Sequence, residues 1–137
     1  MNYFDRDAVP QGTKFLDISD KADIHDTVKL SNFIEIRELC VIGENTRIGS
    51  FVIMGAGTWI GKNCQIHGMA AFADQGNHFD KDVVAPILGN NVILGTRCTI
   101  MGGVHIGDNA VIGAGSVVMC DVPAGETWVG TPARKLK

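Results

Sequence analysis

The sequence lacks the features that mark several common protein classes. Its 137 residues contain no apolar run near the roughly 20 residues of a membrane-spanning helix, and no N-terminal segment typical of a secretory signal. A formal net charge of −3 disfavours nucleic acid as the main partner. These absences predict one domain without a membrane span, with the cytoplasm as its default location.

Patterns for metal binding and for disulfides are missing as well. The four cysteines form no CxxC pair, which argues against a zinc site. Three of them, Cys40, Cys64 and Cys98, occupy the same small position of a repeat, where cysteine serves as a small buried hydrophobe. The sequence therefore predicts no metal and no disulfide framework.

What the sequence has instead is a period of six. Large apolar residues recur at this spacing, and a small or β-branched residue usually follows each of them four places later. This period excludes an amphipathic helix, whose period is about 3.6. It fits a short strand followed by a tight corner, with glycine, asparagine or aspartate at the corner. The large residues are Ile18, Ile24, Leu30, Ile36, Ile42, Ile48, Met54, Ile60, Ile66 and Phe72, then Leu88, Leu94, Ile100, Ile106, Ile112 and Val118.

Three such units close a triangular coil of about 18 residues, and coils must stack because one coil cannot bury its own apolar face. The sixteen repeats predict an all-β parallel β-helix of about five coils. Phe4 and Phe15 are expected to plug the open end of its core. The predicted parts are a cap at 1–15, a first repeat run at 16–72, a catalytic loop at 73–87, a second run at 88–122 and a tail at 123–137.

One loop interrupts the repeat, and His78 lies near its middle. The step from Phe72 to Leu88 is sixteen residues, which is not a multiple of six. Residues must therefore protrude from the prism. Ten protrude if the loop spans one corner, and four if it spans two.

The second run and the tail, GNNVILGTRCTIMGGVHIGDNAVIGAGSVVMCDVPAGETWVGTPARKLK, resemble the maltose and galactoside O-acetyltransferases and related polysaccharide-cluster acetyltransferases. The resemblance extends back through GKNCQIHGMAAFADQGNHFDKD, and IGAGSVV and VGTPAR are its most specific motifs. It implies a left-handed β-helix, a homotrimer, and acetyl-CoA bound along the groove between neighbouring subunits. The implied acceptor is a hydroxyl or amine of a sugar or similar small molecule. Because the loop is shorter than in the sugar acetyltransferases, that sugar need not be maltose or galactose.

By this resemblance, His78 is the catalytic histidine. Transfer from a thioester needs a base for the acceptor's proton, and an imidazole with a pKa near its usual value of about 6.5 suits that role. Asn77 or Asp80 would orient the imidazole, or else serves only the solubility of the loop. Since the repeat cysteines point inward, no nucleophile stands out, and direct transfer in a ternary complex is expected.

The resemblance also implies a binding site for acetyl-CoA. Gly95 and Thr96 would face the thioester, where a backbone amide or a hydroxyl stabilises the developing oxyanion. The glycines of IGAGSVV would let the pantetheine arm approach the backbone, or are plain repeat corners. The basic tail would pack on adenine and meet the 3′-phosphate. These last two groups are Gly113, Ala114 and Gly115, and Thr131, Pro132, Ala133, Arg134 and Lys135.

Two other functions compete with acetyl transfer. A metal lyase of the γ-carbonic-anhydrase type shares the fold but needs two zinc-binding histidines five residues apart, and His25, His67, His78 and His105 provide no such pair. A non-catalytic scaffold is the other alternative, and the intact loop and the VGTPAR motif argue against it. His67 and His105 either line the groove between subunits or lie on the surface. The favoured function is that of an acetyl-CoA-dependent O- or N-acetyltransferase without a metal.

Overall fold

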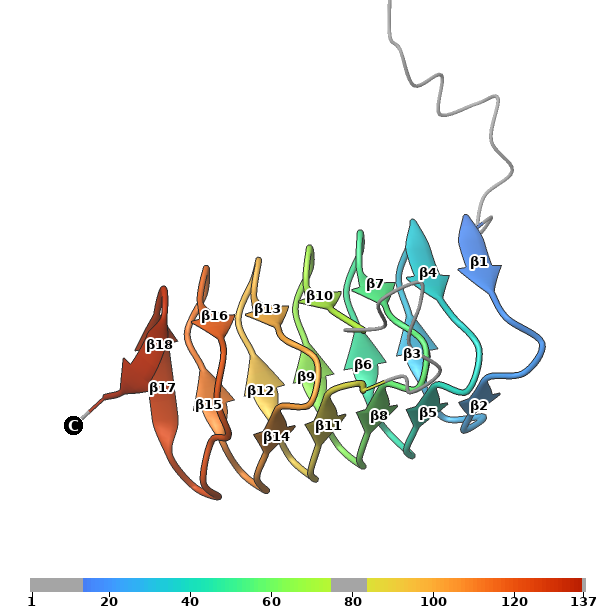
Figure 1. Ribbon diagram of the computed structural model, residues 1–137. Coiled ribbons are helices and arrows are strands. Elements are labelled where there is room, and N and C mark those ends of the chain that lie inside the picture. Colours follow the sequence, from blue (N-terminus) through green and yellow to red (C-terminus); the bar gives the residue numbers. More distant parts are fainter. Residues whose placement is uncertain (1–13, 75–83, 137) are drawn as a thin grey trace, which may run out of the picture.

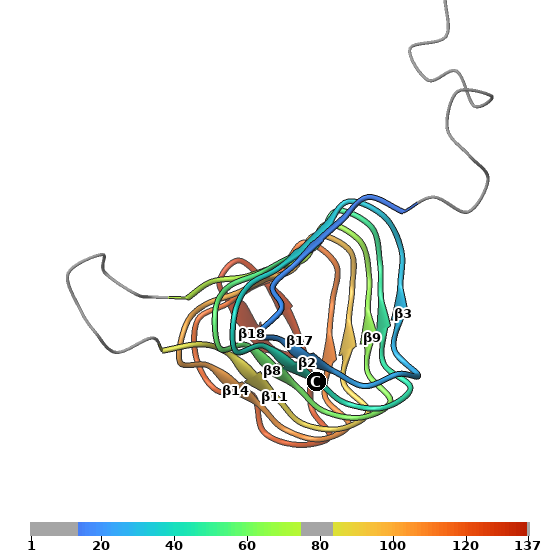
Figure 2. The same cartoon turned by 90° about the vertical axis from the view of Figure 1, so that its right-hand side faces the viewer.

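The computed structural model describes residues 14–74 and 84–136. The described chain winds into a triangular prism of three sheets (Figures 1 and 2) and contains no helix. Seen along the axis from the N-terminal end, it turns counter-clockwise as it recedes (Figure 2). The fold is therefore the expected left-handed parallel β-helix, an exception to the usual right-handed crossover.

The three sides of the prism are named here sheets A, B and C. Sheet A contains β1 (Leu16–Ile18), β4 (Ile34–Ile36), β7 (Ile53–Met54), β10 (Ala71–Phe72), β13 (Thr99–Ile100) and β16 (Val117–Val118). Sheet B contains β2 (Asp23–Ile24), β5 (Val41–Ile42), β8 (Trp59–Ile60), β11 (Ile87–Leu88) and β14 (His105–Ile106). Sheet C contains β3 (Lys29–Leu30), β6 (Arg47–Ile48), β9 (Gln65–Ile66), β12 (Ile93–Leu94), β15 (Val111–Ile112), β17 (Thr127–Gly130) and β18 (Ala133–Lys135).

Successive coils pair in parallel and in register. Val41 lies beside Trp59, its counterpart one coil later, and the same register holds around the prism. Sheet A has six strands, so the prism has six coils, close to the expected five. The sixth is irregular, because Val122 forms only an isolated bridge to Ile106 before β17 begins.

The core has the two inward positions that the repeat predicts. From Ile36 to Ile112, each large repeat residue on a described strand is almost fully buried. Each such aliphatic side chain stabilises the fold by roughly 1.5–3 kcal/mol. Hydroxyls at the small position are also satisfied: Thr46 donates to the Gly61 carbonyl at 2.9 Å, and Thr58 donates to the Gly55 carbonyl at 2.7 Å.

The N-terminal end of the core differs from the prediction. Phe15 is 49% exposed and stacks on Phe33 at a centroid distance of 5.2 Å, outside the prism. The expectation that it plugs the core was wrong. Phe15 lies at the corner before β1, which begins only at Leu16, so its side chain is not in an inward strand position. Phe4 lies outside the described residues.

The corners use two different residue sets for the left-handed backbone conformation. Between sheets B and C, the expected asparagines have positive φ, for example Asn45 at 58° and Asn109 at 61°. Between sheets C and A, bulky residues take that conformation, including Phe33 at 57° and Phe51 at 60°. The rings of this pair stack at 4.9 Å, which offsets part of a backbone cost of about 1–2 kcal/mol per residue.

The loop leaves the prism at the edge between sheets A and B. Phe72, on β10, occupies the position of Met54 one coil earlier, and Leu88, on β11, occupies that of Ile60. Sixteen residues therefore separate positions that are six apart in the preceding coil, so the loop spans one corner and holds ten extra residues.

The cysteines give the first testable prediction. Burial raises the pKa of the thiols of Cys40, Cys64 and Cys98, and Cys120 is exposed. Because the thiolate is the reactive form, we expect a dithiobis-nitrobenzoate titration near pH 8 to detect one fast thiol per native chain and four after denaturation. A Cys120→Ser variant should lose the fast thiol, and a second fast thiol would contradict the buried placement.

Candidate active site

The base of the interrupting loop is fixed by the coils on both sides of it. Asp74 accepts a hydrogen bond through Oδ2 from the Ala56 amide at 3.1 Å, one coil nearer the N-terminus. On the other side, a Cβ placed on Gly103 would lie 3.0 Å from Cγ1 of Val84. Both ends of the loop thus lie at the edge between sheets A and B, here called the AB edge. The predicted catalytic residues Asn77, His78 and Asp80 lie outside the described residues.

The residues predicted to meet the thioester lie on a different edge. Gly95 and Thr96 connect β12 to β13, at the corner between sheets C and A, here called the CA edge. The Gly95 amide donates to the Ile112 carbonyl at 2.8 Å, and the Thr96 carbonyl accepts from the Gly115 amide at 2.8 Å. A Cβ on Gly95 would lie 2.5 Å from the Ala114 nitrogen, so this glycine is required for the close stacking of two corners.

The IGAGSVV corner stacks on that of Gly95 and is open on its outer side. Gly113 and Gly115 lie at the CA edge one coil later, with Ala114 exposed between them. Gly115 has φ of 72°, and a Cβ there would meet nothing within 4 Å. The edge therefore has space for a ligand close to the backbone.

The tail reaches the same edge. β17 and β18 form an antiparallel hairpin on sheet C, and Thr131 at its turn donates through Oγ1 to the Gly115 carbonyl at 3.3 Å. Pro132 follows in the turn, and Arg134 is exposed beyond it. Ala133 is 1% exposed and packs in the core, and Lys135 pairs with Glu126 at 3.7 Å. The side chain of Ala133 is thus unavailable to a ligand, whereas those of Thr131 and Arg134 are accessible.

The sequence-predicted features therefore form two groups. The glycine corners and the tail meet at the CA edge, and the described ends of the loop lie at the AB edge (Figure 2). Sheet A separates these two edges within one chain. Features on these two edges face each other only if a second copy of the chain lies alongside.

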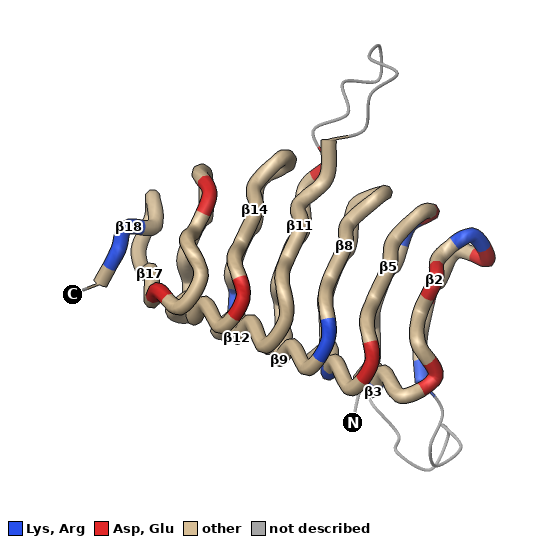
Figure 3. The backbone as a smooth tube through the Cα atoms, turned by 90° about the horizontal axis from the view of Figure 1, so that it is seen from below, with Lys and Arg blue, Asp and Glu red and all other residues tan. Residues whose placement is uncertain are grey.

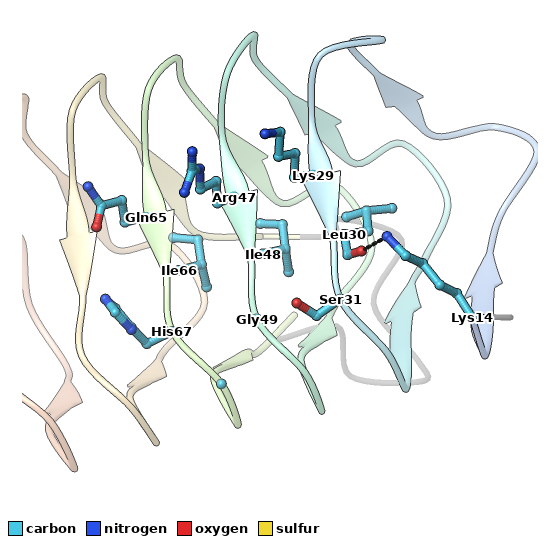
Figure 4. Close-up of a pocket in the computed structure, with 11 residues that line it drawn as sticks. Lys14, Lys29, Leu30, Ser31, Arg47, Ile48, Gly49, Gln65, Ile66 and His67 are labelled. Atoms are coloured by element: carbon cyan, nitrogen blue, oxygen red, sulfur yellow. Dashed lines mark hydrogen bonds between the residues drawn. The ribbon is translucent and has the colours of Figure 1, made fainter. Parts of the chain in front are cut away.

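A hollow that the sequence analysis did not single out lies on sheet C, in the first three coils (Figure 4). Its volume is about 490 Å³, within the usual range for small-molecule sites. Lys14, Lys29, Arg47 and His67 line it. The signal was available, because Lys29 and Arg47 are one coil apart and each precedes a large repeat residue, but no motif marks the pair.

Similarity to known proteins agrees with this architecture. The family described as bacterial transferase hexapeptide (six repeats) matches residues 39–73 and 85–119. The chain belongs to the hexapeptide-repeat transferases. Both matched segments are repeat runs, and the loop lies between them.

Three relatives illustrate the family. The serine acetyltransferase of Helicobacter pylori is 32% identical over 136 residues, covering 98% of this chain and 70% of that protein. The bifunctional protein GlmU of Listeria monocytogenes is 38% identical over 103 residues, which are 75% of this chain and 21% of GlmU. The soybean serine acetyltransferase structure is 30% identical with a TM-score of 0.63, covering 85% of this chain and 43% of that one.

This hexapeptide-repeat transferase spans about a fifth of the length of the GlmU proteins that it matches. These relatives support the family and do not show the narrower resemblance to maltose and galactoside acetyltransferases. Within residues 14–74 and 84–136, no three His, Cys, Asp or Glu side chains are grouped as metal ligands. The same residues include no helix suited to crossing a bilayer.

Proposed function

We propose that this chain is an acetyltransferase that moves an acetyl group from acetyl-CoA to a hydroxyl or amine of a small acceptor, with His78 as general base. The placement of the two described ends of the loop and of the glycine corners on opposite edges of sheet A carries the proposal. In a cyclic homotrimer, the AB edge of one subunit faces the CA edge of the next, so each of three sites takes its loop and its cofactor edge from different chains. The reaction then belongs in the cytoplasm, where acetyl-CoA is available.

The chemistry follows from the groups in each half. The His78 imidazole takes the proton of the acceptor group as that group attacks the thioester carbonyl. A C–O or C–N bond forms, the C–S bond breaks, and the CoA thiolate leaves and is protonated. The three repeat cysteines are not placed to act as an enzyme nucleophile, because they are buried and the burial raises the pKa of each thiol. Transfer is therefore direct, from acetyl-CoA to the acceptor.

Thr96 is the better oxyanion donor of the predicted pair. The Gly95 amide is already committed to the Ile112 carbonyl at 2.8 Å. Thr96 is exposed, and its amide and hydroxyl have no acceptor among the described residues. We therefore assign the developing negative charge of the tetrahedral intermediate to the Thr96 amide or hydroxyl.

The proposal predicts acceptor-dependent thiol release. Purified protein with acetyl-CoA should release CoA with at least one member of a panel of neutral sugars, amino sugars, sugar phosphates and hydroxyl-bearing amino acids. The released thiol is read against the background of Cys120, the exposed cysteine. Calorimetry should also detect CoA binding. No CoA binding and no acceptor-dependent release would favour the scaffold alternative and overturn the proposal.

A further inference from the structure

The outer face of sheet C changes character along the prism. Its outward residues are charged or polar in the first three coils and apolar in the fourth and fifth, in the order Lys29, Arg47, Gln65, Ile93 and Val111. Within the described residues, lysine and arginine lie mostly in the first three coils and in β18 (Figure 3). The hollow lies over the charged part of this face.

Two cations are stacked directly on each other in this hollow. Lys29 and Arg47 are register partners in the pairing of β3 with β6, and adjacent strands lie about 4.8 Å apart. Like charges at such positions destabilise a sheet unless an anion lies between them. Lys14 enters from the N-terminal side and donates through Nζ to the Leu30 carbonyl, which brings a third cation to the same hollow (Figure 4).

No carboxylate neutralises these cations within the described residues. The ion pairs there join Arg37 to Glu35, Lys62 to Glu44 and Lys135 to Glu126. The lining of the hollow contains no aspartate or glutamate. Ser31, also in the lining, adds a hydroxyl donor for a bound anion.

The hollow is continuous with the CA edge. His67 and Gly68 line it and lie directly under the Gly95 corner: the His67 amide donates to the Leu94 carbonyl at 3.1 Å, and the Arg97 amide donates to the Gly68 carbonyl at 3.0 Å. Arg47 is two coils from Gly95 and Lys29 is three, roughly 10 and 14 Å along the axis.

The charge of the hollow selects the kind of anion. A free hydroxyl-bearing amino acid is a zwitterion without net charge, and the cations that line the hollow repel its ammonium group. A phosphorylated sugar has a ring between its acceptor group and its phosphate, and its dianionic phosphate matches several cations better than a carboxylate does.

We infer that the hollow is the anion subsite of the acceptor, with Lys29 and Arg47 binding the phosphate of a phosphorylated sugar while its hydroxyl or amine lies at the CA edge. The inference rests on the proposed function for the position of the thioester. A sugar phosphate monoester and a nucleoside-diphosphate sugar share this chemistry.

Calorimetry without acetyl-CoA tests the subsite independently of catalysis. Glucosamine 6-phosphate and UDP-glucosamine represent the two phosphate sources, and glucosamine, which has the same amine, is the reference without phosphate. At least one phosphorylated ligand should bind about tenfold or more tightly than glucosamine, and higher salt should weaken this preference. Arg47→Gln and Lys29→Gln should each lose about 10- to 100-fold in affinity for that ligand.

Lys62→Gln is the matched control, because Lys62 is an exposed cation that pairs with Glu44 at 3.3 Å, outside the hollow. It should change affinity less than about twofold. Arg47→Gln should leave the KM for acetyl-CoA unchanged, and a raised value would assign the hollow to the phosphates of CoA and overturn the inference. Equal binding by wild type and Arg47→Gln would overturn it too. Phosphate-dependent binding without transfer to any acceptor would instead overturn the proposed function.

Discussion

Replacing His78 by alanine is expected to lower the rate of acetyl transfer by about 10²- to 10⁴-fold, the usual contribution of a positioned general base. The acceptor group would have to lose its proton to water instead, while binding of acetyl-CoA at the CA edge stays intact. The measurement is kcat/KM with acetyl-CoA and the best acceptor of the panel. Calorimetric CoA binding and the thermal midpoint show whether the variant remains folded.

His25→Ala is the matched control for that substitution. His25 is an exposed histidine at the corner between sheets B and C, and its Nδ1 lies 2.8 Å from Thr27 Oγ1. Its loss should leave the rate within about twofold of wild type, as for surface residues in general. Turnover at the wild-type rate by His78→Ala would show that His78 is not the general base.

The period of six was sufficient to predict the architecture. Each repeat contributes one large and one small inward residue, and the strands from β4 onward bury both, as at Ile42 and Thr46. The number of protruding loop residues, four or ten, could not be predicted from the sequence. The structure decides it through the pairing of Phe72 with Met54 and of Leu88 with Ile60. Long-range pairing of this kind is not encoded in any local window.

Two features are not visible in any short stretch of the sequence. Phe33 and Phe51 adopt a backbone conformation that sequence rules assign to glycine or asparagine, and their mutual stacking is visible only in three dimensions. Lys29 and Arg47 are eighteen residues apart, so they form a pair only when the coil length is applied to the outward positions. The core was predictable because buried residues recur every six positions. A surface site is harder to predict, because it combines outward residues that only the stacking of coils brings together.

The division of the site between two edges is the central claim, and it allows two inactive chains to restore each other. One is His78→Ala, which retains a normal CA edge. The other is Ala114→Trp, in which a ring on an exposed CA-edge residue would block acetyl-CoA. Ala124→Trp is its control, because Ala124 is exposed and its nitrogen lies 2.5 Å from a Cβ built on Gly107, as that of Ala114 does for Gly95.

The decisive measurement is the activity of mixed trimers of His78→Ala and Ala114→Trp chains, co-expressed with two affinity tags and purified through both. Every mixed cyclic trimer has one interface that joins an intact loop to an intact CA edge, so we predict about one third of wild-type activity from two parents that are each inactive. Mixed trimers as inactive as their parents, or chains that never co-purify, would contradict a site shared between subunits.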